Sequence, residues 1–204
     1  NLNELFELQA KLDAHIEKEH PRQPSEDRLA KKILALQVEL GELANEWRGF
    51  KFWSNDQEPR IKGYKQVKCK WCNGSGDDGT GVCPDCKCEG YVYKEYNPLL
   101  EEYIDVVHFA LSIGLDIDIK QEIFPEPIKY GDVVLQFNEL FGQISYFASV
   151  LNRENEWEEV EYEYERIWSL LFGLASLLGF TWEQIEQAYL AKNKINHERQ
   201  ESGY

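Results

Sequence analysis

The sequence has no apolar run of membrane-spanning length and few basic residues for its size. Its 204 residues contain nothing that approaches the roughly 20 consecutive apolar residues of a transmembrane helix. Lys and Arg number 22 against 37 Asp and Glu, which gives a formal net charge of −15. Such a surface repels the phosphate backbone of nucleic acids, and most of the acidity serves solubility. We therefore expect neither a membrane nor duplex nucleic acid as a partner.

The sequence has no cysteine outside one short segment, and nothing in it leads us to expect a secretory leader. No basic stretch followed by an apolar stretch opens the chain, so we expect no signal peptide and a cytoplasmic location. All five cysteines lie between residues 69 and 88. A disulfide scaffold would spread cysteines through the chain, whereas a cluster in an intracellular protein favours a metal site.

The residues that are present predict an all-α fold. Hydrophobic residues make up 43% of the chain and aromatic residues 13%, enough for a sizeable core, and they recur mostly at helical spacing. We predict a helical bundle of about six helices, formed by one domain of residues 1–53 and 98–204. Residues 54–97, rich in Gly, Asp, Lys and Cys, are predicted to be an insert with short strands. The predicted helices are 2–19, 25 to about 47–53, 98 to about 114, 131–151, 157–178 and 181–199.

Two predicted helices carry paired carboxylates beside their apolar stripes. In "LQVELGELANEW", Glu39, Glu42 and Glu46 share one helix face, and Glu102 and Asp105 are similarly spaced on a second helix. Burying such groups together is unfavourable unless cations neutralise them, and hard oxygen ligands suit Mg²⁺ or Mn²⁺. Two facing pairs could hold two or three ions over a polyphosphate, with one ion activating water. The alternative is an ordinary solvated acidic face.

The last predicted helix carries cations and amides on one face. In "YLAKNKINHERQESGY", Lys192, Asn196 and Arg199 are spaced to lie on one stripe. Such a stripe suits phosphates and sugar hydroxyls. The alternative is a basic helix end favoured by the helix dipole, which accounts for the cations but not for the amides.

The cysteines form two pairs with the spacing of zinc ligands. Cys69 and Cys72 make one C-x-x-C pair, and Cys83 and Cys86 make the other. This pattern predicts one tetrahedral, structural Zn²⁺ site, because four thiolates leave no position for water. Cys88 is the spare cysteine and could compete with Cys86, and a redox pair is the alternative function. The run C-x-x-C-x-G-x-G is similar to the zinc repeats of DnaJ-type proteins, and glycines there allow tight turns around the metal.

Four stretches together resemble a known enzyme family. "VELGELANEW", "FKFWS", "LLEEYIDVVHFALSIG" and "YLAKNKINHERQESGY" are similar to the dimeric all-α dUTPases, within the all-α nucleotide pyrophosphatase superfamily that includes MazG. The resemblance covers nearly all of the chain except residues 54–97. It implies a homodimer that hydrolyses dUTP to dUMP and pyrophosphate with Mg²⁺. The Mg²⁺ ligands that it implies are Glu39, Glu42, Glu102 and Asp105, with Glu39 activating the attacking water.

The same resemblance implies a set of substrate-binding residues. Gln9 would read the base, but the family often has Asn four residues later, where this chain has Asp13. That difference puts the base preference in doubt and keeps another nucleotide, such as dCTP, as an alternative substrate. A non-catalytic zinc-ribbon interaction protein on a helical scaffold is the alternative from a different class. The other implied residues are Lys51, Lys192 and Arg199 for phosphates, Asn196 for the sugar, Trp53 for the pocket wall, and Phe109 for base stacking or the core.

Overall fold

The computed structural model describes residues 1–119, 123, 125–153 and 157–203. In this part of the chain the structure has six helices and one two-stranded sheet, which confirms the all-α fold with a small insert. The elements are α1 (Leu2–Glu19), α2 (Arg28–Trp47), β1 (Gly63–Lys68), β2 (Tyr91–Tyr96), α3 (Pro98–Asp116), α4 (Val133–Leu151), α5 (Trp157–Leu178) and α6 (Trp182–Glu201). No helix in the described residues combines the length and apolar character needed to cross a membrane.

Side-chain caps determine where the helices begin. The prediction that Ser25 opens α2 is wrong by two residues, because Asp27 is the residue that caps the helix: its carboxylate accepts a hydrogen bond from the Ala30 backbone N–H. At α6, Thr181 and Gln184 bond reciprocally to each other's backbone N–H groups in a capping box. The predicted start of α6 at Thr181 is therefore confirmed.

The ends of α1, α2, α4 and α5 agree with the prediction, while α3 and α6 each run two residues further. Helix α2 ends at Trp47 because Arg48 adopts a left-handed backbone with φ 65°. The buried Arg48 guanidinium then binds the carbonyl and the carboxylate of Asp56, which fastens the segment that follows. Helix α3 continues past the predicted end near Gly114 to Asp116.

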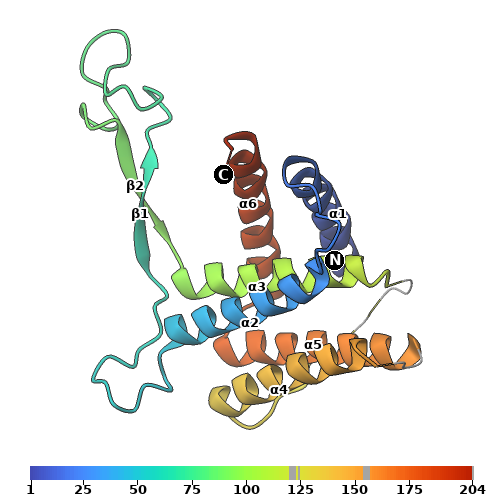
Figure 1. Ribbon diagram of the computed structural model, residues 1–204. Coiled ribbons are helices and arrows are strands. Elements are labelled where there is room, and N and C mark those ends of the chain that lie inside the picture. Colours follow the sequence, from blue (N-terminus) through green and yellow to red (C-terminus); the bar gives the residue numbers. More distant parts are fainter. Residues whose placement is uncertain (120–122, 124, 154–156, 204) are drawn as a thin grey trace.

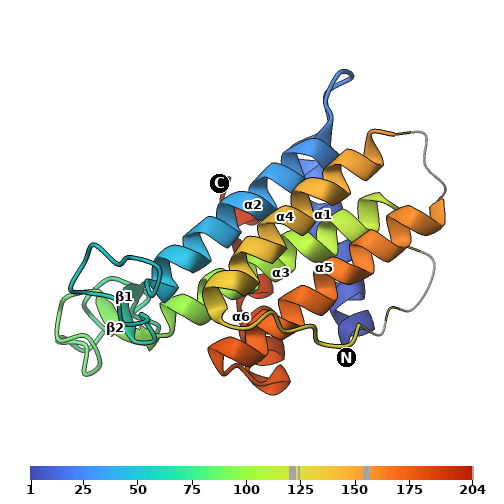
Figure 2. The same ribbon diagram turned by 90° about the horizontal axis from the view of Figure 1, so that it is seen from below.

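The six helices form three layers (Figure 1). Helices α2 and α3 make the middle layer and run in opposite directions, while α4 and α5 cover one side of them. Helices α1 and α6 lie on the other side, where they contact each other and α3 at a steep angle to its axis. Figure 2 shows α2, α3, α4 and α5 from below as four nearly aligned rods. Helix α3 therefore packs against helices on both of its sides.

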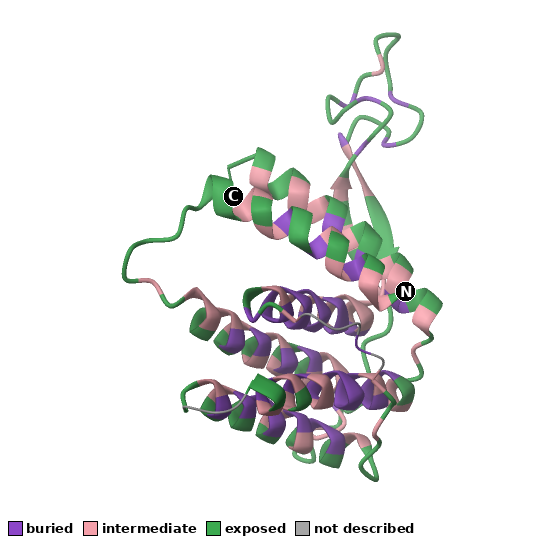
Figure 3. Cartoon of the chain, turned by 90° about the vertical axis from the view of Figure 1, so that its right-hand side faces the viewer, coloured by how far each residue is buried: buried purple, intermediate pink, exposed green. Residues whose placement is uncertain are grey.

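One continuous core joins these layers. Figure 3 shows buried residues along the sides of the helices that face one another. The largest fully buried side chains include Trp168 and three tyrosines, Tyr103, Tyr164 and Tyr189. Each of the three tyrosine hydroxyls donates to a backbone carbonyl or to an amide oxygen, so none of these hydroxyls lacks a partner.

The two strands form an arm that projects from the end of the bundle where α2 stops and α3 starts (Figure 1). They pair antiparallel from Gly63 opposite Tyr96 to Lys68 opposite Tyr91. All five cysteines belong to the segment that connects β1 to β2, at the far end of the arm. The predicted zinc-bearing segment thus stands apart from the helical core.

Candidate functional site

Three predicted carboxylates meet between α2 and α3. Glu39 and Glu42 on α2 and Glu102 on α3 can place one oxygen each within 4.8 Å of the others. The antiparallel course of the two helices brings these side chains together, since α2 carries the first pair near its end and α3 carries Glu102 near its start. Asp105 is not part of this group, because its Oδ2 lies 2.7 Å from the Lys192 ammonium on α6.

The electrostatics of this cluster favour a bound cation. Burial raises the pKa of Glu39 to about 7, with further repulsion from Asp105 and Glu42. Burial likewise raises the pKa of Glu102 to about 7, and the other three carboxylates add to the effect. Because the groups are held close enough to resist ionisation, a divalent cation that binds their oxygens would relieve the repulsion. The donor set therefore fits Mg²⁺ or a similar hard ion.

Glu46 belongs to a different interaction. Its carboxylate lies 3.2 Å from the Arg60 guanidinium, and its carbonyl accepts a hydrogen bond from the Arg60 backbone N–H. The side chain shares a helix face with Glu39 and Glu42, as predicted, but it fastens the segment that leads into the arm.

A cavity of about 680 Å³ reaches this cluster at Glu39, whereas Glu42 and Glu102 are not among the described residues that line it. Its walls come from α1, α2, α3 and α6 and from the segment between α1 and α2. Seven of the predicted site residues line it: Gln9, Glu39, Asp105, Phe109, Lys192, Asn196 and Arg199. The cavity thus has carboxylates on one wall and a face with cations and an amide on α6.

Lys51 and Trp53 lie elsewhere in the structure. Both follow the end of α2, and neither is among the described residues that line the cavity. Trp53 is 66% exposed and packs edge-on against Phe50 and Phe52, and the Lys51 ammonium lies over the Phe50 ring. The structure therefore does not bring these two predicted residues to the cavity, and their substrate role stays a prediction.

Gln9 is held by a buried hydrogen-bond network. Its Oε1 accepts from the Tyr189 hydroxyl at 2.9 Å and lies 2.8 Å from His108 Nδ1, while its Nε2 donates to Asp13 at 2.7 Å. Both lone pairs of the amide oxygen are used, so one hydrogen of Nε2 remains for a ligand. The sequence predicted that the Gln9 amide would both donate to and accept from a base. In the structure it can only donate to a ligand.

Sequence reasoning missed His108, which lines the cavity, and the buried Tyr189, which bonds to Gln9. Their rings stack at 4.3 Å between centroids, and burial lowers the pKa of His108 to about 3, so the imidazole is neutral. His108 lies three residues after Asp105 and therefore shares its helix face. That spacing could have identified it, and it could also have identified Tyr189, which lies three residues before Lys192 on α6.

Asp13 ends the network at the far part of the cavity. Its carboxylate accepts hydrogen bonds from Gln9 and from the Ser112 hydroxyl, and the Lys32 ammonium lies 3.4 Å away. Ser112 lies seven residues after Asp105 on α3, which is about 10 Å along the helix axis. This distance is comparable to that between the phosphates and the base of a nucleotide.

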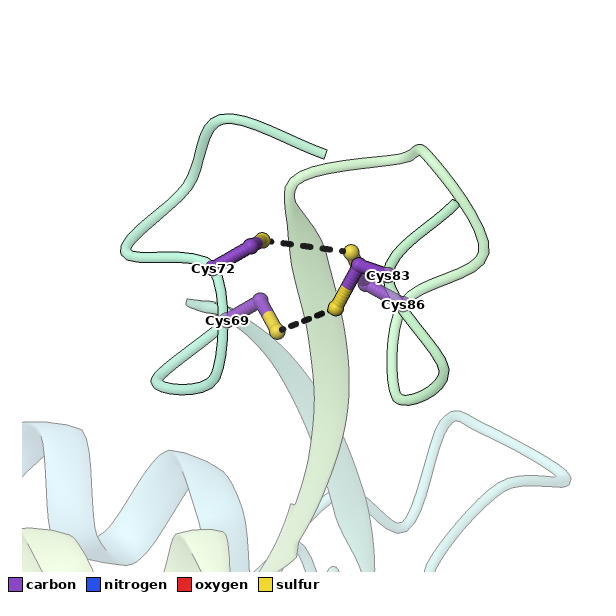
Figure 4. A group of neighbouring side chains, drawn as sticks. All are labelled: Cys69, Cys72, Cys83 and Cys86. Carbon is purple, nitrogen blue, oxygen red and sulfur yellow. Dashed lines mark hydrogen bonds between the residues drawn. The ribbon is translucent and has the colours of Figure 1, made fainter. Parts of the chain in front are cut away.

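Four cysteines form a second metal-compatible group at the end of the arm (Figure 4). The Sγ atoms of Cys69 and Cys83 are 3.8 Å apart, and those of Cys72 and Cys86 are 3.5 Å apart. Ligand sulfurs about 2.3 Å from a tetrahedral Zn²⁺ are separated by similar distances. Cys88 is exposed and lies outside the group. The predicted four-cysteine set is therefore compatible with zinc.

The turns of the arm need glycine at two places. Gly76 and Gly90 have φ near 80°, and each donates its N–H to a cysteine sulfur at 3.2 Å. A Cβ at either position would lie 2.5 Å from a backbone carbonyl oxygen. Glycine is thus required for the tight turns that aim N–H groups at the sulfurs.

The chain also matches a known protein family. A family described as dUTPase matches residues 1–66 and 92–204. The chain belongs to this dUTPase family. The unmatched residues 67–91 of this dUTPase-family chain contain every cysteine, and the matched residues contain both the carboxylate cluster and the cavity.

A curated relative is similar over a shorter stretch. The chaperone protein DnaJ of Chlorobium luteolum (strain DSM 273 / BCRC 81028 / 2530) is 31% identical over 86 residues. The match covers 40% of this chain and 22% of the DnaJ protein. The match spans only about a fifth of the DnaJ protein, so the similarity is local and does not place this chain in the DnaJ family.

Proposed function

We propose that the chain is a Mg²⁺-dependent dUTP diphosphatase that releases dUMP and pyrophosphate. The observation that carries this proposal is the cluster of Glu39, Glu42 and Glu102, which adjoins a nucleotide-sized cavity through Glu39. A nucleoside triphosphate supplies the phosphate oxygens that such carboxylate-held cations prefer. Family membership supports a nucleotide pyrophosphatase, and the site supports the metal dependence.

The residues of the chain have distinct roles in this reaction. Mg²⁺, when bound by Glu39, Glu42 and Glu102 with Asp105 nearby, would neutralise phosphate charge and lower the pKa of a bound water. Glu39 orients the attacking water and accepts its proton, a role that suits its raised pKa. The water oxygen attacks the α-phosphorus, the bond to the bridging oxygen of the β-phosphate breaks, and pyrophosphate leaves.

The remaining cavity residues bind the substrate. Lys192 and Arg199 hold phosphate oxygens, Asn196 the sugar hydroxyl, and Phe109 stacks on the base. Gln9 donates its free amide hydrogen to a carbonyl of the uracil ring.

A second substrate is favoured by one observation. Asp13 lines the cavity where the family often has Asn, and a carboxylate offers only acceptors. An acceptor suits the exocyclic amino group of cytosine, so dCTP is the second candidate substrate. A panel of nucleoside triphosphates, compared by the kcat/KM of pyrophosphate release, would rank the two.

Glu39→Gln tests the enzyme function. We expect kcat for dUTP to fall about 100-fold or more, because the amide neither accepts the proton nor binds the cation as a carboxylate does. The matched control is Glu7→Gln, since Glu7 is exposed on α1 and away from the cavity. Circular dichroism would establish that both variants fold.

Two results would contradict the proposal. If the parent protein hydrolysed no nucleoside triphosphate with Mg²⁺, the zinc-ribbon interaction module would be the better description. If Glu39→Gln kept full activity, the carboxylate cluster would not be the reacting site. Whether the protein forms the homodimer that the resemblance implies is tested separately, by measuring its mass with light scattering after size-exclusion chromatography.

A further inference from the structure

Glu101 lies between two lysines from different parts of the fold. The Lys65 ammonium on β1 is 2.9 and 3.2 Å from the two carboxylate oxygens of Glu101. The Lys192 ammonium on α6 is 3.3 Å from Oε1 of the same carboxylate and 2.7 Å from Asp105. A continuous chain of ion pairs therefore joins the arm to the cavity.

These ion pairs are shielded from water more than ordinary surface pairs. The side chains of Lys192 and Asp105 are 11% and 19% exposed, and that of Glu101 is 25% exposed. Lys65 is 36% exposed, and its ammonium also lies 4.6 Å from the centre of the Tyr96 ring on β2. Charges in such surroundings are weakly screened, so their positions affect one another.

Lys192 has two carboxylate partners, and one of them belongs to the metal side of the cavity. A divalent cation that binds the Asp105 carboxylate withdraws negative charge from it and so weakens its 2.7 Å contact with Lys192. Glu101 is then the partner that remains for the ammonium. The Lys65 ammonium contacts both carboxylate oxygens of Glu101 and so fixes the position of this carboxylate. In that position Glu101 can hold the Lys192 ammonium at the cavity.

We propose that Lys65 and Glu101 are positioning residues for Lys192, through which the zinc-bearing arm contributes to nucleotide binding. Among the described residues that line the cavity, neither Lys65 nor Glu101 is found, so both act through Lys192. The inference rests on the proposed function, because only a nucleotide substrate would give Lys192 a triphosphate to bind. It assigns the base of the arm a role that the carboxylate cluster alone does not require.

The position of Lys65 depends on the structure of the arm. Lys65 pairs with Lys94 in the strand register, and the hairpin closes beyond the strands where the Cys69 backbone N–H donates to the Gly90 carbonyl. Cys69 follows directly after the last residue of β1 and is one of the four clustered cysteines. The cysteine group therefore directly adjoins the paired strands that place Lys65 beside Glu101.

Lys65→Met tests this role against a matched control. Lys62→Met removes the same charge from the same arm, but Lys62 pairs with Glu95 at 2.8 Å and not with Glu101. We measure the affinity of α,β-imido-dUTP with Mg²⁺ by calorimetry, and KM and kcat for dUTP hydrolysis. Lys65→Met should weaken analogue binding about three- to tenfold and raise KM similarly, with kcat within about twofold of the parent. Lys62→Met should change neither quantity.

A double-mutant cycle separates positioning from general charge. Glu101→Gln alone should weaken analogue binding to a similar degree, because Lys192 loses its remaining anchor. Lys65→Met added to Glu101→Gln should weaken it no further, since the two residues act through one contact. Lys65→Arg keeps the cation and should restore the affinity of the parent, and it serves as the folded comparison if Lys65→Met is unstable.

Several outcomes would overturn the inference. Unchanged affinity in Lys65→Met, an equal loss in Lys62→Met, or a full additional loss in the double variant would each exclude positioning through Glu101. If the parent protein neither binds the analogue nor hydrolyses dUTP, the proposed function itself fails before any variant is compared.

Discussion

The metal-free carboxylate cluster makes the protein less stable as pH rises. Glu39 and Glu102 have pKa values of about 7 in the folded protein against 4.5 for a free side chain. Between these values the folded state binds more protons than the unfolded state, so the free energy of unfolding falls as pH increases. The stabilising contribution is complete below about pH 4.5 and is lost as pH passes through 7.

The size of this effect follows from the shift and from the exposure of the groups. One pKa unit corresponds to about 1.4 kcal/mol. Both side chains are only about half buried, so screening reduces their combined contribution to about 2 kcal/mol. For a chain of this length, that difference lowers Tm by about 4–8 °C between pH 5 and pH 8.

Thermal unfolding in buffer without divalent cations measures this change. Glu39→Gln should flatten the dependence of Tm on pH, whereas Glu7→Gln, at an exposed position, should keep the slope of the parent. Millimolar Mg²⁺ should raise Tm at pH 8 more than at pH 5, because it binds only the folded, ionised cluster. An equal slope in Glu39→Gln and the parent would refute the reasoning.

Two further predictions concern the arm and the core. The protein should contain one Zn²⁺ per chain, released by a thiol-modifying mercurial and detected with a chromogenic chelator, and Cys83→Ser should abolish stoichiometric zinc while the helical circular dichroism remains. Full zinc retention by Cys83→Ser would contradict the four-cysteine site. Leu43→Ala should lower the free energy of unfolding by about 2–4 kcal/mol, because Leu43 is fully buried. Leu34→Ala, 62% exposed on the same helix, should change it by less than about 0.5 kcal/mol, and equal losses would contradict the packing.

Much of the fold and part of the site could be predicted from the sequence alone. Helical periodicity is local, so the spacing of apolar residues predicted six helices, and the i, i+3 spacing placed Glu39 and Glu42 on one face. The C-x-x-C pairs likewise predicted the cysteine group, because four sulfurs at short sequence distances converge without help from the rest of the chain. These features depend on residues a few positions apart.

Only the tertiary structure decided how the distant groups pair. Asp105 lies 87 residues before Lys192, and Gln9 lies 99 residues before His108 and 180 before Tyr189, so no local pattern links them. The packing of α1 and α6 onto α3 places Asp105 beside the Lys192 ammonium and gives the Gln9 amide oxygen a hydrogen bond from Tyr189. Trp53, which follows α2, is exposed and lies away from the cavity. The position of a residue on a helix face fixes the direction of its side chain. The group that neutralises its charge or completes its hydrogen bonds comes from another helix, and the packing of the whole core selects that group.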